Sequence, residues 1–256
     1  MRPYADRMLE LMAGTARASS SVRGLPLLQQ REDVRAVAIA PLVGDRGLAG
    51  AFNSQVLRRA LALERQLRAE GKQVQWVAVG RKGASSLRFR RFSLEGEFTG
   101  FADQPSYGDA QAVAHRLAEL YTNEDADRVV IVYNAFESAL VQRVTVRELL
   151  PLSEDVLETS AEEREDDARH GDFIFEPEPE QILERLLPVY LETEIYRALL
   201  ESAASFQGAQ MTAMRNASKN AGELIDSLTL AMNRARQAEI TQEILEVVAG
   251  ADALTT

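Results

Sequence analysis

The 256-residue sequence contains no cysteine, only two histidines and a single tryptophan. The absence of cysteine excludes disulfide cross-links, thiol nucleophiles and metal sites that use thiolate ligands. Long apolar runs are also missing, because no stretch reaches the about 18 to 20 residues that a helix needs to cross a bilayer. The first six residues contain no apolar segment of the kind found in a secretory signal peptide. The charge balance and the order of strands and helices are therefore the informative features.

The balance of charged residues is acidic, with a net charge of −10. An acidic surface repels the phosphate backbone, so we expect no nucleic-acid partner. The two histidines, His115 and His170, are far apart in the sequence, and we therefore expect neither a metal site nor a histidine that transfers protons. The hydrophobic content of 46% is enough for one sizeable core, or for a core plus an extended helical element.

Short apolar segments suited to strands alternate with amphipathic segments suited to helices over the first two thirds of the chain. This alternation is typical of an α/β layer. Strands are predicted at residues 34–40, 74–79, 128–133 and 172–177, and helices at residues 4–17, 54–70 and 107–122. Residues 142–146 alternate in polarity and are predicted as a more exposed, antiparallel strand. The acid-rich stretch 158–172 is predicted as a solvated loop, and Trp76 as a core residue.

The last third of the chain is helical in pattern almost without a break, from residue 180 to about residue 249. At 1.5 Å per residue such a helix is about 100 Å long, which is several times the length of an ordinary globular helix. It therefore cannot lie on the α/β domain alone. A seam with alternating spacings of three and four residues, the period of a left-handed coiled coil, follows its second half. The seam consists of Met214, Ala217, Ala221, Leu224, Leu228, Ala231, Ala235, Ala238, Gln242 and Leu245.

Small side chains along the seam require a partner helix that approaches closely. We predict that this partner is the N-terminal helix, returning antiparallel to the C-terminal one. The alternative is a long helix packed on its own domain, and the helix length argues against it. Amide and guanidinium groups cluster near the C-terminal end of the helix, and this arrangement favours insertion into a partner over an ordinary solvated face.

Two segments far apart in the sequence carry a family resemblance. The first is Asp45-Arg46-Gly47-Leu48-Ala49-Gly50-Ala51-Phe52-Asn53, directly after the first predicted strand. The second is Asn233-Arg234-Ala235-Arg236-Gln237-Ala238-Glu239-Ile240-Thr241-Gln242-Glu243-Ile244, followed by Gly250-Ala251-Asp252-Ala253-Leu254. In this order the segments resemble the gamma subunit of F-type ATP synthases. Members of that family normally begin with a longer, basic helix, so we expect this chain to open within the later part of that helix, as a truncated form.

The resemblance implies a three-part organisation. Residues 1–28 would be the truncated N-terminal stalk helix, residues 29–178 a Rossmann-like α/β foot domain, and residues 179–256 the long C-terminal stalk helix. The expected fold class is α/β, with an antiparallel coiled coil formed by the N- and C-terminal helices. In this family the helices form an eccentric shaft inside a ring of three alpha and three beta subunits. Rotation of the shaft couples proton flow through the membrane sector to ATP synthesis or hydrolysis on the beta subunits, which implies no catalytic site and no cofactor on this chain.

The resemblance also implies which residues touch partners. Three residues resemble those that contact the catch loops of the beta subunits: Arg236, Gln237 and Thr241. Three more are expected near the lower shaft, where moving beta segments touch it: Asp45, Arg46 and Gly47. The foot is expected to meet the epsilon subunit and the c-ring of the membrane sector through Phe173, Phe175, Glu176 and Pro177. The expected location is a peripheral membrane complex on the cytoplasmic face of a bacterial inner membrane.

Three other interpretations of the sequence compete with this one. The glycines of residues 44–50 could form a phosphate-binding loop, but neither GxGxxG nor GK[ST] is present, and a turn after a buried strand is the simpler reading. The runner-up function is a small α/β nucleotide-dependent enzyme with a helical oligomerisation tail. A purely structural coiled-coil adaptor is the third possibility, and it would stimulate no ATPase.

Overall fold

The computed structural model describes residues 8, 12, 15, 25–31, 33–152 and 179–254. The chain divides into two compact units, Met1–Gln210 and Met211–Thr256, which we call the N-terminal unit and the C-terminal unit. A single helix, α6 (Pro179–Leu254), contributes to both units. The expected boundaries at residues 28/29 and 178/179 are not tested by this division and stay predictions.

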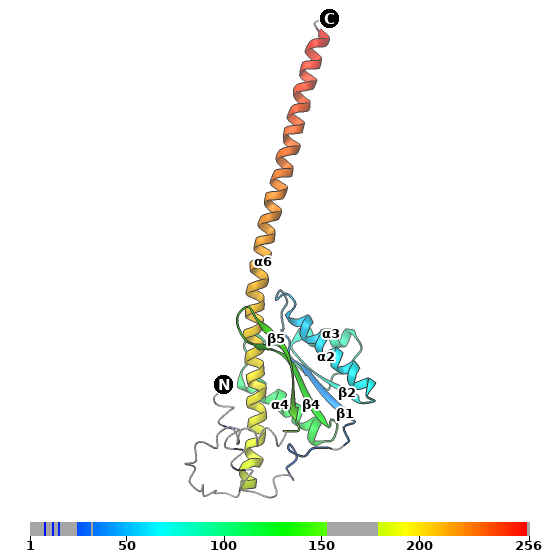
Figure 1. Cartoon of the computed structure of the whole chain (residues 1–256), viewed down its shortest axis with the longest axis vertical. Coiled ribbons are helices and arrows are strands. Elements are labelled where there is room, and N and C mark those ends of the chain that lie inside the picture. The colour runs from blue at the N-terminus through cyan, green and yellow to red at the C-terminus, as the bar shows by residue number, and fades with distance from the viewer. Residues whose placement is uncertain are drawn as a thin grey trace. The chain divides into compact units, whose positions relative to one another are not determined.

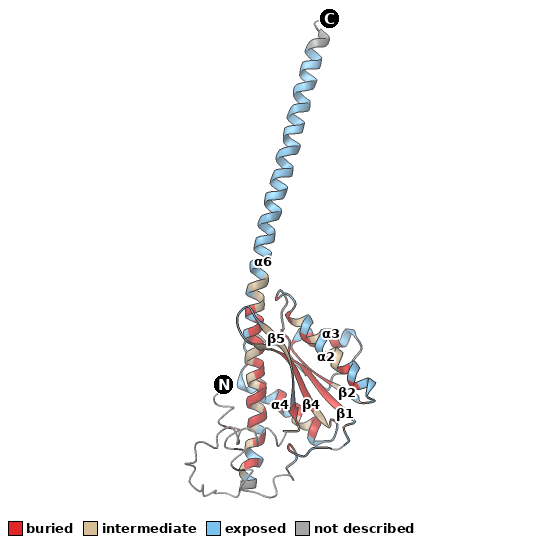
Figure 2. Cartoon of the chain, in the orientation of Figure 1, coloured by how far each residue is buried: buried red, intermediate tan, exposed pale blue. Residues whose placement is uncertain are grey.

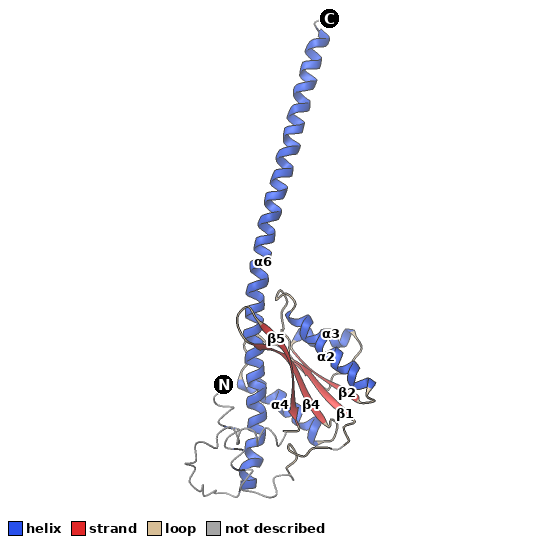
Figure 3. Cartoon of the chain, in the orientation of Figure 1, coloured by secondary structure: helices blue, strands red, loops and turns tan. Residues whose placement is uncertain are grey.

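A five-stranded sheet with the order β3-β2-β1-β4-β5 forms the centre of the N-terminal unit (Figure 3). Its strands are β1 (Ala36–Pro41), β2 (Gln73–Val79), β3 (Gly96–Phe98), β4 (Arg128–Phe136) and β5 (Gln142–Leu150). The first four strands run parallel, and β5 pairs antiparallel with β4. The apolar run of β1 is buried almost throughout, as expected for a central strand covered on both faces. The predicted antiparallel strand at residues 142–146 is confirmed, since it is the first part of the half-exposed β5.

Two pairs of helices cover the sheet, α2 (Phe52–Ala69) with α3 (Arg81–Phe89), and α4 (Tyr107–Thr122) with the first part of α6. Figure 1 shows α2 and α3 on the side of the sheet opposite to α6. The start of α4 is fixed by a capping box in which Ser106 and Asp109 bond to each other's backbone N–H. The predicted helices at residues 54–70 and 107–122 are thus confirmed, whereas α3 and the three-residue strand β3 were not predicted.

Alternate residues of β1 belong to the two sides of the core. Val37 and Ile39 pack in the cluster that includes residues of α2 and α3, whereas Ala38 and Ala40 pack in the cluster that includes residues of α4 and α6. Figure 2 shows the buried strands between these layers. Trp76 is 1% exposed, which confirms its prediction as a core residue.

Only three residues of the predicted helix at 4–17 are described. Met8 and Met12 are helical and lie in the same hydrophobic cluster as Leu191 and Ile195 of α6. Thr15 is also helical and buried. The predicted acidic loop at 158–172, the strand predicted at 172–177, and His170 lie outside the described residues.

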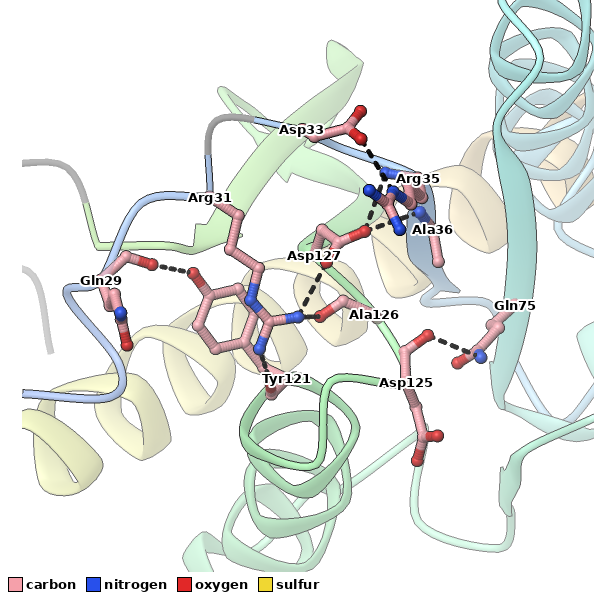
Figure 4. Close-up of polar contacts among 10 residues, drawn as sticks. All are labelled: Gln29, Arg31, Asp33, Arg35, Ala36, Gln75, Tyr121, Asp125, Ala126 and Asp127. Carbon is pink, nitrogen blue, oxygen red and sulfur yellow. Dashed lines mark hydrogen bonds and ion pairs between the residues drawn. The ribbon is translucent and has the colours of Figure 1, made fainter.

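A polar clamp ties the segment before β1 to the turn between α4 and β4 (Figure 4). The Arg31 guanidinium donates to the Asp127 carboxylate at 2.8 Å, to the Ala126 carbonyl at 3.3 Å and to the Tyr121 carbonyl at 2.6 Å. It also lies 4.9 Å from the centre of the Tyr121 ring, a cation–π distance. The Tyr121 hydroxyl donates in turn to the Gln29 carbonyl at 2.5 Å. The chain that enters β1 is therefore held by both charge and aromatic contacts.

Candidate functional site

The first part of the family-like motif forms a loop at the carboxyl end of β1. Asn53, at the start of α2, closes this loop, because its side-chain oxygen accepts from Gly44 N–H at 2.8 Å and its side-chain nitrogen donates to the Arg46 carbonyl at 3.1 Å. The Arg46 side chain also pairs with Asp103 at 3.1 Å. The loop between residues 44 and 53 is consequently held in one conformation from both ends.

Asp45 joins this loop to two neighbouring segments of the sheet edge. One carboxylate oxygen accepts from Arg81 N–H at 2.8 Å, and the other accepts from Gly100 and Ala102 N–H, both at 2.9 Å. Burial alone would raise the pKa of Asp45, but these backbone donors and the nearby Arg81 charge outweigh burial and lower it below the ordinary value. Asp45 therefore carries a negative charge that is committed to internal bonds.

This carboxylate also bears on the phosphate-loop interpretation. Arg81 is the first residue of α3, and its N–H would be a donor for a bound phosphate. Asp45 already occupies that N–H and would repel a phosphate group. The geometry favours a structural turn after a buried strand.

Arg46, Gly47 and Leu48 form the outward side of the loop. The Arg46 side chain is 78% exposed, and Leu48 is 76% exposed. Leu48 also has a φ of 65°, in the left-handed region that costs a branched side chain free energy. A β-carbon on Gly47 would meet only the end of Lys82, at 3.9 Å, so the backbone there is open to a partner. A leucine held in an unfavourable conformation and exposed to solvent is a candidate contact residue.

The loop is seated on α6 within the N-terminal unit. Phe52 and Phe206 pack edge to face with ring centroids 5.4 Å apart, and Ala49 is buried in the same cluster. A β-carbon on Gly44 would lie 2.8 Å from the Phe206 ring, so the backbone can approach the helix only because this residue is glycine. Both ends of the loop are therefore packed against α6.

Every residue of α6 from 214 to 251 is exposed, as Figure 2 shows by its pale blue colour. The exposed set includes large apolar side chains on the predicted seam, such as Leu224 (59%) and Leu228 (60%). A helix does not leave this much apolar surface in water unless a partner covers it. The described residues show no helix packed on this seam, so the antiparallel coiled coil stays a prediction.

The predicted contact residues near the end of α6 lie within this exposed stretch. Arg236, Gln237 and Thr241 are all exposed, and Thr241 donates to the Gln237 carbonyl one turn earlier at 2.8 Å. No ion pair of Arg236 is found among the described side chains. The guanidinium is thus available to an acceptor on another chain.

Comparison with known proteins identifies the family. The family model described as ATP synthase matches residues 1–254. The ATP synthase gamma chain of Rubrobacter xylanophilus is 50% identical over 99% of this chain and 84% of its own length. The gamma chain of Nostoc punctiforme is 42% identical over 99% of this chain and 87% of its own length. The chain belongs to the ATP synthase gamma family.

Solved structures agree with this membership. The central stalk and c-ring structure of the Tetrahymena thermophila mitochondrial ATP synthase contains a chain with a TM-score of 0.57 and 25% identity, covering 84% of this chain and 99% of that chain. A chain from the Euglena gracilis mitochondrial ATP synthase, in a structure of OSCP, F1 and c-ring, has a TM-score of 0.64. It covers 99% of this chain and 90% of that chain, and at 19% identity it supports the fold alone.

The expected contact residues of this gamma-family chain fall into three sets. Asp45, Arg46 and Gly47 share one loop of the N-terminal unit, and the set on α6 shares one exposed stretch of the C-terminal unit. The third set, Phe173, Phe175, Glu176 and Pro177, lies outside the described residues. None of these contacts is tested by the structure of a single chain.

Sequence reasoning missed Leu48 and Phe206. Leu48 belongs to the family-like motif, but nothing in the sequence indicates that its backbone is left-handed. Phe206 is one of many apolar side chains in a long helix, and its role depends on a loop about 160 residues earlier. The described residues contain no group of three metal-ligating side chains. In the same set no helix is both long and apolar enough to cross a membrane.

Proposed function

We propose that this chain is the rotating central-stalk subunit of an F-type ATP synthase, coupling proton flow through the membrane sector to ATP synthesis or hydrolysis on the beta subunits. The observation that supports the proposal most directly is the exposed apolar seam of α6 in a chain of the gamma family. A helix of 76 residues whose second half is exposed among the described residues is suited to a shaft that works inside other subunits.

The work of such a shaft is mechanical. Each beta subunit has open and closed forms, and a shaft with unlike faces gives each form a different contact free energy as it turns. The N-terminal helix would cover the seam, and the remaining faces of α6 would meet the alpha and beta subunits. The chemistry of ATP then belongs to the beta subunits, and this chain has no catalytic site and binds no cofactor.

The exposure of residues in two described regions supports the proposed contact surfaces. Arg236, Gln237 and Thr241 would bond to the catch loops of the beta subunits. In the loop after β1, Arg46, Gly47 and Leu48 would make the contact, while Asp45 holds the loop in place through its three backbone bonds.

The foot would meet the membrane sector. Phe173, Phe175, Glu176 and Pro177 are proposed to contact the epsilon subunit and the c-ring. The subunit would then belong to a peripheral membrane complex on the cytoplasmic face of a bacterial inner membrane, which agrees with the bacterial sources of its relatives.

Reconstitution with matched alpha and beta subunits tests the proposal. We expect the full chain to co-purify with them and to give ATPase turnover that depends on its presence. A chain that ends at Gln210 lacks the C-terminal unit and serves as the control, since it should not support turnover. Failure of the full chain to assemble, together with tight nucleotide binding by the chain alone, would instead favour the α/β enzyme interpretation.

A further inference from the structure

The turn between β4 and β5 meets α6 at Gly208. A β-carbon built on Gly208 would lie 2.7 Å from the Ala139 carbonyl oxygen and 3.2 Å from the Gln142 side-chain nitrogen. Real β-carbons are not found that close to a backbone oxygen, so any other residue at 208 must displace the turn or the helix. Glycine in a helix interior costs about 1 kcal/mol relative to alanine. The glycine is needed here because only a residue without a β-carbon lets the helix lie this close to the turn.

The turn itself is held rigidly in this position. Ser138 and Val141 exchange backbone hydrogen bonds at 3.0 and 3.3 Å, and the Ser138 hydroxyl accepts a further bond from Val141 N–H at 3.0 Å. The Gln142 side chain donates to the Ala139 carbonyl at 3.0 Å. The carbonyl that faces Gly208 is therefore fixed by its own turn and is not a flexible side-chain end.

Two directional contacts next to Gly208 act on the same part of α6. Ser205 is fully buried, and its hydroxyl donates to the Asn134 carbonyl of β4 at 3.1 Å. Phe206 is packed edge to face on Phe52, the first residue of α2. This part of α6 therefore contacts both β4, through Ser205, and the start of α2, through Phe206.

A second set of polar contacts between α6 and the sheet lies three turns earlier on the helix. The Glu194 carboxylate, 3% exposed, pairs with Arg147 of β5 at 2.7 Å and with Arg197 at 3.1 Å. Eleven residues separate Glu194 from Ser205, so the two side chains lie on nearly the same face, about 16 Å apart along the axis. Apolar packing alone permits a helix to roll slightly, whereas directional polar contacts at two heights resist rolling.

We propose that Gly208 is a positioning residue that fixes the rotational setting of α6 on the sheet within the N-terminal unit, so that this part of the helix and the α/β foot turn together. The inference rests on the proposed rotor function and adds to it a device for transmitting torque. The glycine brings the hairpin carbonyl against the helix, and Ser205 and Glu194 hold that setting.

Two other glycines in α6 show that the close contact is specific to position 208. A β-carbon on Gly222 or on Gly250 would meet nothing within 4 Å. The neighbouring Gln207 is exposed and gives a matched control on the same turn of the helix. Ser205→Ala removes the hydrogen bond to the Asn134 carbonyl without adding volume. It therefore tests the same positioning of α6 by an independent route.

Single-molecule rotation of the assembled alpha–beta–gamma complex measures how firmly α6 is held on the sheet. Because the chain has no cysteine, Arg59→Cys on the exposed side of α2 gives one attachment point for a bead on the foot. The readout is the variance of the bead angle while the rotor waits for ATP. We expect Gly208→Ala to increase this variance by about 1.5-fold, since overpacking displaces the turn from the helix. Ser205→Ala should cause a smaller increase, and Gln207→Ala none.

The outcomes separate this inference from the proposed function. If the complex with the natural residues at 205, 207 and 208 does not assemble or rotate, the rotor proposal fails, and this inference fails with it. If that complex rotates, but Gly208→Ala and Ser205→Ala give the same angular variance as Gln207→Ala, the positioning role is overturned while the rotor function stands. A lower melting temperature of Gly208→Ala without wider fluctuation also overturns it, because that result describes packing alone.

Discussion

Arg31 and Asp127 lie 96 positions apart in the sequence and form an ion pair, with Arg31 Nη1 2.8 Å from Asp127 Oδ1. Both side chains are largely buried, at 22% and 13% exposure. The second oxygen of Asp127 accepts from the backbone N–H groups of Arg35 and Ala36, both at 2.8 Å. One carboxylate therefore joins the segment before β1, the start of β1 and the turn before β4.

The first prediction is that Asp127→Asn lowers the free energy of unfolding by about 2 kcal/mol, as expected for lost charge-assisted hydrogen bonds. The amide oxygen can still accept from the backbone, but its NH₂ group then faces the donors of Arg31. Urea unfolding of the full chain measures the change. Asp125→Asn is the matched control, because it removes the same charge from an exposed side chain two residues away. Equal stability of the two variants would contradict the clamp.

The second prediction concerns acid stability. Burial tends to raise the pKa of Asp127, but the hydrogen bond from Arg31 and the two backbone donors outweigh burial and lower it. The folded pKa is then below the unfolded value of about 3.9. The stabilisation is fully present above that unfolded value and is lost as the pH falls through the folded pKa. We expect the free energy of unfolding to decrease below about pH 4, and less steeply in Asp127→Asn; parallel pH profiles would argue against this cause.

The third prediction is that Leu48→Asn leaves the foot at least as stable but weakens rotor function. Asparagine tolerates the left-handed conformation better than leucine, and relief of that strain is worth up to about 1 kcal/mol. The variant also removes an exposed apolar contact from the loop after β1. We expect an unchanged or higher melting temperature, with lower ATPase turnover in the reconstituted complex. Phe89→Asn, which removes an 85% exposed side chain from the end of α3, should leave turnover unchanged.

The sequence predicted the elements whose signals are local and long. The apolar run of β1, the amphipathic α2 and α4, and the unbroken helical pattern of α6 all have the period of the structure they form. The sequence missed α3 and β3 because α3 has only 9 residues and contains Gly83, while β3 has only 3 residues. Segments this short contain too few repeats of the hydrophobic pattern to be recognised in the sequence, and contacts with neighbouring elements decide their structure.

The candidate site was only partly predictable for a related reason. The family resemblance identified the loop after β1, but the role of Asp45 depends on N–H groups at residues 81, 100 and 102, which no local pattern brings together. The sequence alone gave Asp45 and Arg46 the same role. The structure distinguishes an internal carboxylate from an exposed guanidinium.

The last prediction is that Arg236→Ala combined with Gln237→Ala lowers ATPase turnover and coupling without unfolding the foot. Both side chains are exposed, and in the described part of the chain Arg236 has no ion pair that would be lost. Alanine also has high helix propensity, so α6 should keep its helical content. If the two side chains bond to beta subunits during turnover, their loss should cost about fivefold to tenfold in rate, equivalent to about 1 to 1.4 kcal/mol.

ATPase assays and urea unfolding of the same preparations separate the two effects. Arg215→Ala is the control, because it removes an exposed arginine from the same helix about six turns earlier. We expect the unsubstituted chain, the double variant and Arg215→Ala to unfold at the same urea concentration. Only the double variant should lose turnover. Full turnover of the double variant in an assembled complex would remove Arg236 and Gln237 from the contact surface. An equal loss in Arg215→Ala would mean that positive charge along the whole helix matters, and not this site near its end.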